Sequence, residues 1–224
     1  MECATSRSLR WFASGDDRML MIARHGQTVM NVGHCVGGPV DSPLTPAGVT
    51  SALLIGHRLA ALAGEATPVQ VRCSPMGRAM VTCALICEAL PQARVCVEPR
   101  IAAVDSGAFN GLPAERIAVL RSAPLEVIMN THDWFFQGPG GETFDMVWDR
   151  CRAALSDLPP GVNLLVTHGL PARLLRCIAM GLKRSQALEL KHPQSAVSLL
   201  SGDLGACNER MLDVAAAGMT DISW

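Results

Sequence analysis

Two short apolar runs constrain the fold of this chain more than any other feature, because each ends in a histidine followed by a glycine. Residues 19–23 read Met-Leu-Met-Ile-Ala and precede Arg24-His25-Gly26, whereas residues 162–166 read Val-Asn-Leu-Leu-Val and precede Thr167-His168-Gly169. Nearly continuous apolar runs of this length are typical of strands buried on both faces of a sheet. The sequence therefore predicts two core strands that each end in an imidazole.

Helical patterns alternate with strand patterns along the chain. Thr45 and Pro46 provide an N-cap and a first-turn proline for a helix that reaches residue 62. The remaining pattern predicts strands at 69–73 and 94–97, helices at 76–90, 113–120 and 143–155, a loop at 27–43, an extended segment at 101–105 and a hairpin of 196–200 with 210–214. We therefore expect an α/β fold, a three-layer sandwich with a mostly parallel central sheet flanked by helices.

Composition limits the classes of protein that this chain can belong to. The 224 residues include 19 basic and 20 acidic side chains, and 49% of all residues are apolar. This balance predicts a sizeable core and excludes charge-driven partners such as nucleic acids and membrane surfaces. We expect a polar N-terminal lead at residues 1–18 and a single domain at 19–224.

The cysteines and the N-terminus bear on the compartment. The nine cysteines are odd in number and form no C-x-x-C pair, which argues against a disulfide framework and against a zinc site. The first 18 residues contain no apolar signal core. The sequence thus predicts a cytoplasmic protein with reduced thiols and without a zinc site.

Basic groups follow three of the predicted strands. Arg24 and His25 end the first, His168 ends the fourth, and the second is followed by Ser74-Pro75 and by Arg78 at a helix start. Ligands of parallel sheets gather at the carboxyl ends of the strands. Two guanidiniums and two imidazoles placed together repel one another unless an anion lies between them. Arginine forks match phosphoryl oxygens, and a neutral imidazole can attack phosphorus, so the predicted ligand is a small phosphorylated compound.

In this order and spacing, the motifs resemble those of the histidine phosphatase superfamily, in its phosphoglycerate-mutase-like branch. The resemblance covers residues 19–181 and rests on these segments: Arg24-His25-Gly26-Gln27-Thr28 with Asn31, Asp41-Ser42-Pro43-Leu44-Thr45-Pro46-Ala47-Gly48, Ser74-Pro75-Met76-Gly77-Arg78-Ala79 with Thr82, Gly140-Gly141-Glu142-Thr143 and Val166-Thr167-His168-Gly169. It implies a phosphoglycerate-mutase-like fold and metal-independent phosphoryl transfer.

The resemblance also implies roles for individual residues. His25 is expected to be the nucleophile that becomes phosphohistidine, and Arg24, Arg78 and His168 are expected to hold the phosphoryl oxygens. Asn31 stands at a motif position that contacts phosphate or substrate in this branch. Substrate contacts are further expected from three residues of the same motifs: Thr28, Glu142 and Gly169.

One position departs from the branch. The general-acid glutamate normally stands four residues before the glycine that is Gly107 here, and this chain has Ala103 at that place. Asp105 shares a face with residue 103 in an extended segment and is one replacement, although a turn-forming role is equally compatible. Glu142 is a second replacement, with a helix N-terminal role as its alternative. The third is chemical: a weakly basic leaving group, or a substrate that carries its own acid, needs no acid from the protein.

The sequence therefore favours hydrolysis of a small phosphomonoester, similar to the broad-specificity and α-ribazole-phosphate phosphatases of the branch. Two alternatives remain open: a phosphoryl transfer of the phosphoglycerate-mutase type, and a non-catalytic descendant that binds phosphorylated ligands. The hairpin at 196–214 could also provide an edge for a homodimer.

Overall fold

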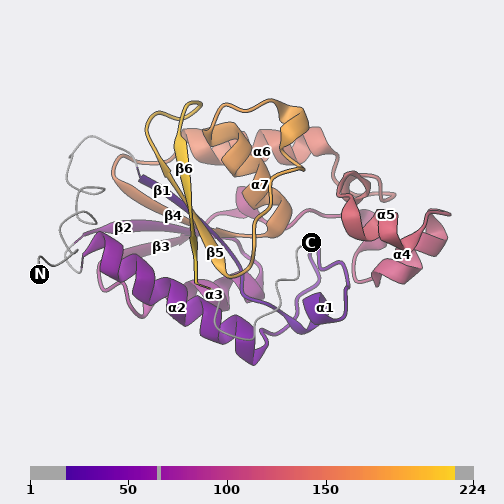
Figure 1. Ribbon diagram of the computed structural model, residues 1–224, viewed down its shortest axis with the longest axis horizontal. Helices are drawn as coiled ribbons and strands as arrows, with labels where there is room; N and C mark the ends of the chain where they lie inside the picture. The colour runs from indigo at the N-terminus through magenta and orange to yellow at the C-terminus, as the bar shows by residue number, and fades with distance from the viewer. Residues whose placement is uncertain (1–18, 65–66, 215–224) are drawn as a thin grey trace, which may run out of the picture.

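A six-stranded mixed sheet forms the centre of the molecule (Figure 1). The structure is a computed structural model that describes residues 19–64 and 67–214, so the predicted lead at 1–18 lies outside the described residues. The strands follow the order β3-β2-β4-β1-β5-β6. Their bounds are β1 Met19–Arg24, β2 Val69–Cys73, β3 Ala93–Val97, β4 Val162–Thr167, β5 Ala196–Ser201 and β6 Asn208–Asp213. The first four pair in parallel, and β5 and β6 continue the sheet antiparallel, which confirms the predicted terminal hairpin.

Helices cover both faces of this sheet. Helices α2 (Pro46–Ala63) and α3 (Gly77–Cys87) lie on one face, and α6 (Phe144–Ser156) and α7 (Gly169–Ala179) lie on the other (Figure 1). The predicted three-layer α/β sandwich is therefore confirmed. No helix of residues 19–64 and 67–214 has both the length and the apolar character needed to cross a membrane.

Strand β1 is apolar throughout because it contributes to two cores. Met19, Met21 and Ala23 pack in the core that β2, α2 and α3 share. Leu20 and Ile22 point to the opposite face and pack with α6 and α7. Alternate side chains of a strand point to opposite faces, so burial on both sides requires apolar residues at every position.

A third, smaller core supports a helical segment beyond the end of the sheet. It contains helices α4 (Ala114–Leu120) and α5 (Leu125–Asn130) and the 3-10 turn η4 (Asp133–Phe136). The indole of Trp134 is buried, and its Nε1 donates to the carbonyl oxygens of Ile128 and Thr131, each at 3.0 Å. Phe135 stacks on Trp134 with ring centroids 3.9 Å apart. Further 3-10 turns are η2 Pro99–Ile101, η3 Gly107–Phe109 and η5 Arg184–Gln186.

Two local predictions need correction. The predicted loop at 27–43 contains the short helix α1 (Val29–Val32), which is capped by the hydroxyl of Thr28. The segment 101–105 was predicted to be extended, but Ile101 ends the 3-10 turn η2, and residues 102–106 lie outside regular structure. In place of a strand ladder, the guanidinium of Arg150 donates to the carbonyl oxygens of Arg100, Ala102 and Ala103 at 2.7 to 3.2 Å.

Candidate active site

His25 lies immediately after β1, and its side chain is 4% exposed. Its Nδ1 lies 2.8 Å from the carbonyl oxygen of Gly26, an acceptor, so Nδ1 carries the proton and Nε2 carries the lone pair. The turn is packed closely, because a Cβ on Gly26 would lie 2.5 Å from the carbonyl oxygen of Gly48 in α2. The Gly26 N–H also donates to Thr82 Oγ1 of α3 at 3.0 Å. These contacts hold the imidazole as a neutral group with an available nitrogen.

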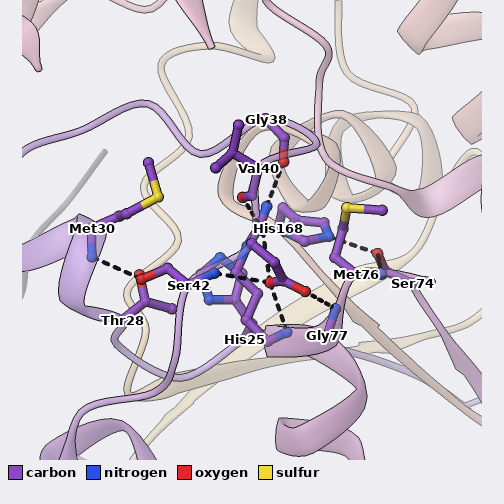
Figure 2. Close-up of polar contacts among 12 residues, drawn as sticks. His25, Thr28, Met30, Gly38, Val40, Ser42, Ser74, Met76, Gly77 and His168 are labelled. Atoms are coloured by element: carbon purple, nitrogen blue, oxygen red, sulfur yellow. Dashed lines mark hydrogen bonds and ion pairs between the residues drawn. The ribbon is translucent and has the colours of Figure 1, made fainter. Parts of the chain in front are cut away.

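The second histidine lies beside the first because their strands are neighbours. β1 and β4 pair in parallel with Arg24 opposite Thr167, and the His25 N–H donates to the Thr167 carbonyl oxygen at 2.9 Å. The ring centroids of His25 and His168 are 5.0 Å apart. The ring of His168 is held by a 2.7 Å hydrogen bond between its Nε2 and Ser74 Oγ, and Figure 2 shows this contact.

Both predicted arginines line the cavity that contains the two imidazoles, and both are almost fully buried. The guanidinium of Arg78 is fixed by the loop after α1: it donates to the carbonyl oxygens of Gly38 at 2.8 Å and Val40 at 2.9 Å. It also forms an ion pair with Asp41 at 3.2 Å. Two backbone carbonyls and one carboxylate therefore fix the position of this guanidinium at the cavity.

The cavity keeps its imidazoles neutral. Burial lowers the pKa of His25 well below its ordinary value of 6.5, and the guanidiniums of Arg24 and Arg78 lower it further. Burial, together with the neighbouring His25, Arg78 and Arg24, lowers the pKa of His168 in the same way. At neutral pH the site thus combines a nucleophilic nitrogen with two fixed positive charges, an arrangement suited to a dianionic phosphoryl group.

These lowered pKa values predict that acid destabilises the fold before its carboxylates titrate. His25, His168 and the buried His192 stay neutral when folded, whereas the unfolded chain binds protons below about pH 6.5. The free energy of unfolding should therefore fall from pH 6.5 to pH 5, by up to about 1.4 kcal/mol per pH unit for each such histidine.

Urea unfolding in phosphate-free buffer measures this dependence. His192→Gln removes one titrating group and should make the slope between pH 6.5 and pH 5 shallower. Carboxylates with lowered pKa values, such as Asp41 and Glu98, titrate mainly below this interval because their ordinary pKa values are 3.8 and 4.5. A free energy of unfolding that stays constant from pH 6.5 to pH 5 would contradict the prediction.

Asn31 and Thr28 also line the cavity. The Asn31 side-chain oxygen accepts from the Thr28 N–H at 3.1 Å, from Thr28 Oγ1 at 3.0 Å and from Gln194 Nε2 at 2.8 Å. With its oxygen engaged by three donors, the amide of Asn31 keeps its nitrogen as the donor for a ligand. Gly169, at the N-terminus of α7, completes the set of predicted residues that line the cavity.

Asp105 and Glu142 are not among the residues that line the cavity. Asp105 Oδ1 accepts from the Gly107 N–H at 2.8 Å and from Asn110 Nδ2 at 2.6 Å, which is the turn-forming alternative named above. Glu142 accepts from the Asp105 N–H at 3.0 Å and forms an ion pair with Arg150 at 2.8 Å. Ala103, by contrast, does line the cavity.

Several residues that position the site were not predicted from the sequence to do so. Ser74, Asp41 and Thr82 stood in the quoted motifs, and the structure shows that they hold His168, Arg78 and the Gly26 turn, respectively. Ser42, in the same stretch as Asp41, accepts from the Met30 N–H at 3.1 Å (Figure 2). Gln194 is distant in sequence from every motif, and no local pattern indicates its contact with Asn31.

Comparison with known proteins identifies the family. The histidine phosphatase superfamily (branch 1) matches residues 20–213. The chain belongs to this superfamily. The predicted resemblance is confirmed, and so is the predicted enzyme class of histidine-type phosphomonoester hydrolases.

Individual relatives share much of the length of the chain. "Probable phosphoglycerate mutase GpmB" of Cronobacter sakazakii is 30% identical over 166 residues, which cover 72% of this chain and 74% of that protein. The crystal structure of the α-ribazole phosphatase from Shigella flexneri has a TM-score of 0.73 at 22% identity, covering 90% of this chain and 99% of that one. A mycobacterial glucosyl-3-phosphoglycerate phosphatase has a TM-score of 0.71 at 24% identity, covering 89% and 100%. At these identities the two structures support the fold alone.

Proposed function

We propose that this member of the superfamily hydrolyses a small phosphomonoester in two phosphoryl transfers through a phosphohistidine on His25. The observation that carries the proposal is the state of His25: a neutral imidazole, its Nδ1–H bonded to Gly26, faces a cavity whose other charged groups are cationic. A site that only bound anions would have no use for a nucleophile held in this tautomer.

In the first transfer, the lone pair of His25 Nε2 attacks phosphorus, and the bond from phosphorus to the ester oxygen breaks. The leaving group departs with the bonding electrons, and the phosphoryl group is then bound to a positively charged imidazolium whose Nδ1–H remains on the Gly26 carbonyl. In the second transfer, water attacks the phosphohistidine. Both water protons leave on the inorganic phosphate, and His25 returns to its neutral form.

Residues of the chain stabilise the negative charge of the phosphoryl group during its transfer. Arg24, Arg78, His168 and Asn31 line the same cavity as His25, and the oxygen of the Asn31 amide is already engaged by Gln194. Phosphoryl transfer depends on positioning and on stabilisation of the equatorial oxygens, which guanidiniums provide in the way that Mg²⁺ does in other enzymes. We therefore propose that the reaction proceeds without a metal ion. Within the described part of the chain, no three His, Cys, Asp or Glu side chains are grouped so that they could hold one.

The two alternatives are less well supported. A mutase must protect its phosphoenzyme from water, whereas the cavity here opens to solvent. The name of the Cronobacter relative favours the mutase, and the names of the two structural neighbours favour a phosphatase. A role limited to ligand binding leaves the position and tautomer of His25 unexplained.

Trapping the intermediate tests the proposal. The protein is mixed with ³²P-labelled p-nitrophenyl phosphate, denatured in alkali within milliseconds and digested, and the labelled peptide is sequenced. We expect an acid-labile, alkali-stable label on His25, together with release of inorganic phosphate on longer incubation. Transfer of the label to an added alcohol in place of water would support the mutase. Absence of both label and turnover with every ester would overturn the proposal.

A further inference from the structure

The cavity contains cationic and apolar groups but lacks a carboxyl group. Of the residues that line it in the described parts of the chain, Arg24 and Arg78 carry a charge, His25 and His168 are held neutral, and none is acidic. Asp41, which contacts the cavity-lining Arg78, is ion-paired with that arginine and bonded to the Gly77 and Arg78 N–H groups at the start of α3. A carboxylate with this many donors is stabilised in its ionised form, so it is a poor source of a proton.

The two carboxyls on the other side of Ala103 are also engaged. Asp105 closes the turn at Gly107 and Asn110, and Glu142 is bonded to Arg150 and to the Asp105 N–H. The same Arg150 holds the carbonyl oxygen of Ala103, so this segment is fixed with residue 103 at the cavity wall. Neither carboxyl reaches the cavity without breaking these contacts.

The remaining protic groups of the lining are weak acids. Thr28 donates its hydroxyl proton to Asn31, and Ser42 accepts from the Met30 N–H. The Cys35 thiol lies 3.3 Å from the Gly33 carbonyl oxygen. Hydroxyl and thiol groups release a proton far less readily than a carboxyl, so they cannot replace a general acid for a strongly basic alkoxide.

Much of the remaining lining of the cavity is apolar. Val36, Val104 and Leu170 line the cavity as buried side chains, and Phe135, Val40 and Pro171 extend this surface. Phe135 is supported by the buried indole of Trp134, on which it stacks. Apolar lining of this kind favours an aromatic or aliphatic body over the hydroxyl groups of a sugar or a polyol.

We propose that the substrates of this site are phosphate monoesters of phenol-like alcohols, whose weakly basic oxygen leaves without a proton and whose apolar body binds against Phe135 and Leu170. This inference rests on the proposed hydrolysis and adds the class of the leaving group. The ester oxygen departs as an aryl oxide and takes its proton from solvent afterwards. Since general acid catalysis contributes about 10²- to 10⁴-fold, alkyl phosphates are disfavoured by a similar factor.

The test is the dependence of kcat/KM on the basicity of the leaving group. It is measured with para-substituted phenyl phosphates and with glycerol phosphate, since kcat/KM reports the first transfer even if the second limits kcat. We expect a steep, unbroken decrease as the leaving group becomes more basic. Phenyl and 2-naphthyl phosphate have leaving groups of similar basicity, and the larger ester should have the lower KM in the native protein but not in Phe135→Ala.

Two substitutions at residue 103 test directly whether a general acid is absent. Ala103→Glu places a carboxyl on the cavity wall and should raise kcat/KM for glycerol phosphate by about 10²- to 10⁴-fold, while the p-nitrophenyl ester gains much less. Ala103→Gln is the matched control, because glutamine has the size of glutamate but no acidic proton. In this variant kcat/KM should still decrease steeply as the leaving group becomes more basic. Asp105→Asn preserves the acceptor of the turn and should not change the slope.

Each result bears on the inference. If kcat/KM of the native protein depends only weakly on the basicity of the leaving group, a proton donor is present. That result overturns the inference without reference to any variant. A slope that steepens in Asp105→Asn assigns the acid to Asp105 and overturns it as well. Equal KM values for the phenyl and naphthyl esters overturn the proposed binding of an apolar leaving group against Phe135 and Leu170. If no ester is turned over and no phosphohistidine forms, the proposed hydrolysis itself fails, which is a different outcome.

Discussion

His25→Ala is expected to lower kcat/KM for p-nitrophenyl phosphate by about 10⁴- to 10⁶-fold, the range seen when the principal group of a covalent mechanism is removed. The nucleophilic nitrogen is lost, and the other imidazole that lines the cavity, His168, has its Nε2 bonded to Ser74 Oγ. Water must then attack the ester directly. Initial rates of nitrophenolate release measure the loss.

Two controls separate chemistry from folding. His57→Ala changes a histidine on the exposed side of α2 and should retain full activity. The His25→Ala protein should also bind inorganic phosphate as a competitive ligand, because Arg24 and Arg78 remain. Added imidazole should restore part of the turnover by filling the space of the missing ring. Activity within tenfold of the native protein would exclude His25 as the nucleophile.

Much of the fold follows from local sequence patterns. Strands β1 and β4 were predictable because a strand between two helical layers is mostly apolar, and the runs at 19–23 and 162–166 are apolar except for Asn163. Helix α2 was predictable from its Thr45 cap and Pro46. The order of the strands was not, because pairing between β1 and β4 joins segments more than a hundred residues apart and depends on the packing of both layers.

The segment at 101–105 shows where local patterns fail. It was predicted only to be extended, and the structure shows that its carbonyl oxygens are bonded to the side chain of Arg150, which in turn is held by Glu142. An arginine that replaces a strand ladder leaves no periodic signal in the sequence. For the same reason, the hydrogen bonds that hold Asp105 and Glu142 outside the cavity could not be predicted from their positions along the chain.

The positions of His25 and His168 were predictable because ligand-binding residues of a parallel sheet gather at the carboxyl ends of its strands. His25 and His168 follow paired parallel strands, so their rings come within 5.0 Å once β1 and β4 are neighbours. The supporting residues were harder to predict. Gln194 reaches Asn31 from a loop 163 residues further along the chain, and a contact at such separation has no counterpart in motif spacing.

Arg78→Ala should lower kcat/KM by about 10³- to 10⁵-fold, as the loss of a guanidinium does in other phosphoryl-transfer sites. Arg78→Lys should recover only part of this, since an ammonium cannot donate to Gly38 and Val40 while also presenting a planar fork to phosphate. Arg58→Ala, on the exposed side of α2, is the matched control and should be fully active. The Ki of inorganic phosphate should rise in parallel with the loss.

The pH profile distinguishes an electrostatic role of Arg78 from a merely structural one. Its guanidinium is one of the causes of the lowered pKa of His25, so removing it lets that pKa rise toward 6.5. Because only neutral His25 attacks phosphorus, the acid limb of kcat/KM should move to higher pH in Arg78→Ala but not in Arg58→Ala. The substrate titrates identically in all variants, so it cancels in the comparison. A loss of rate with an unmoved acid limb would mean that Arg78 acts by holding the loop at 38–41 and not by its charge on the site.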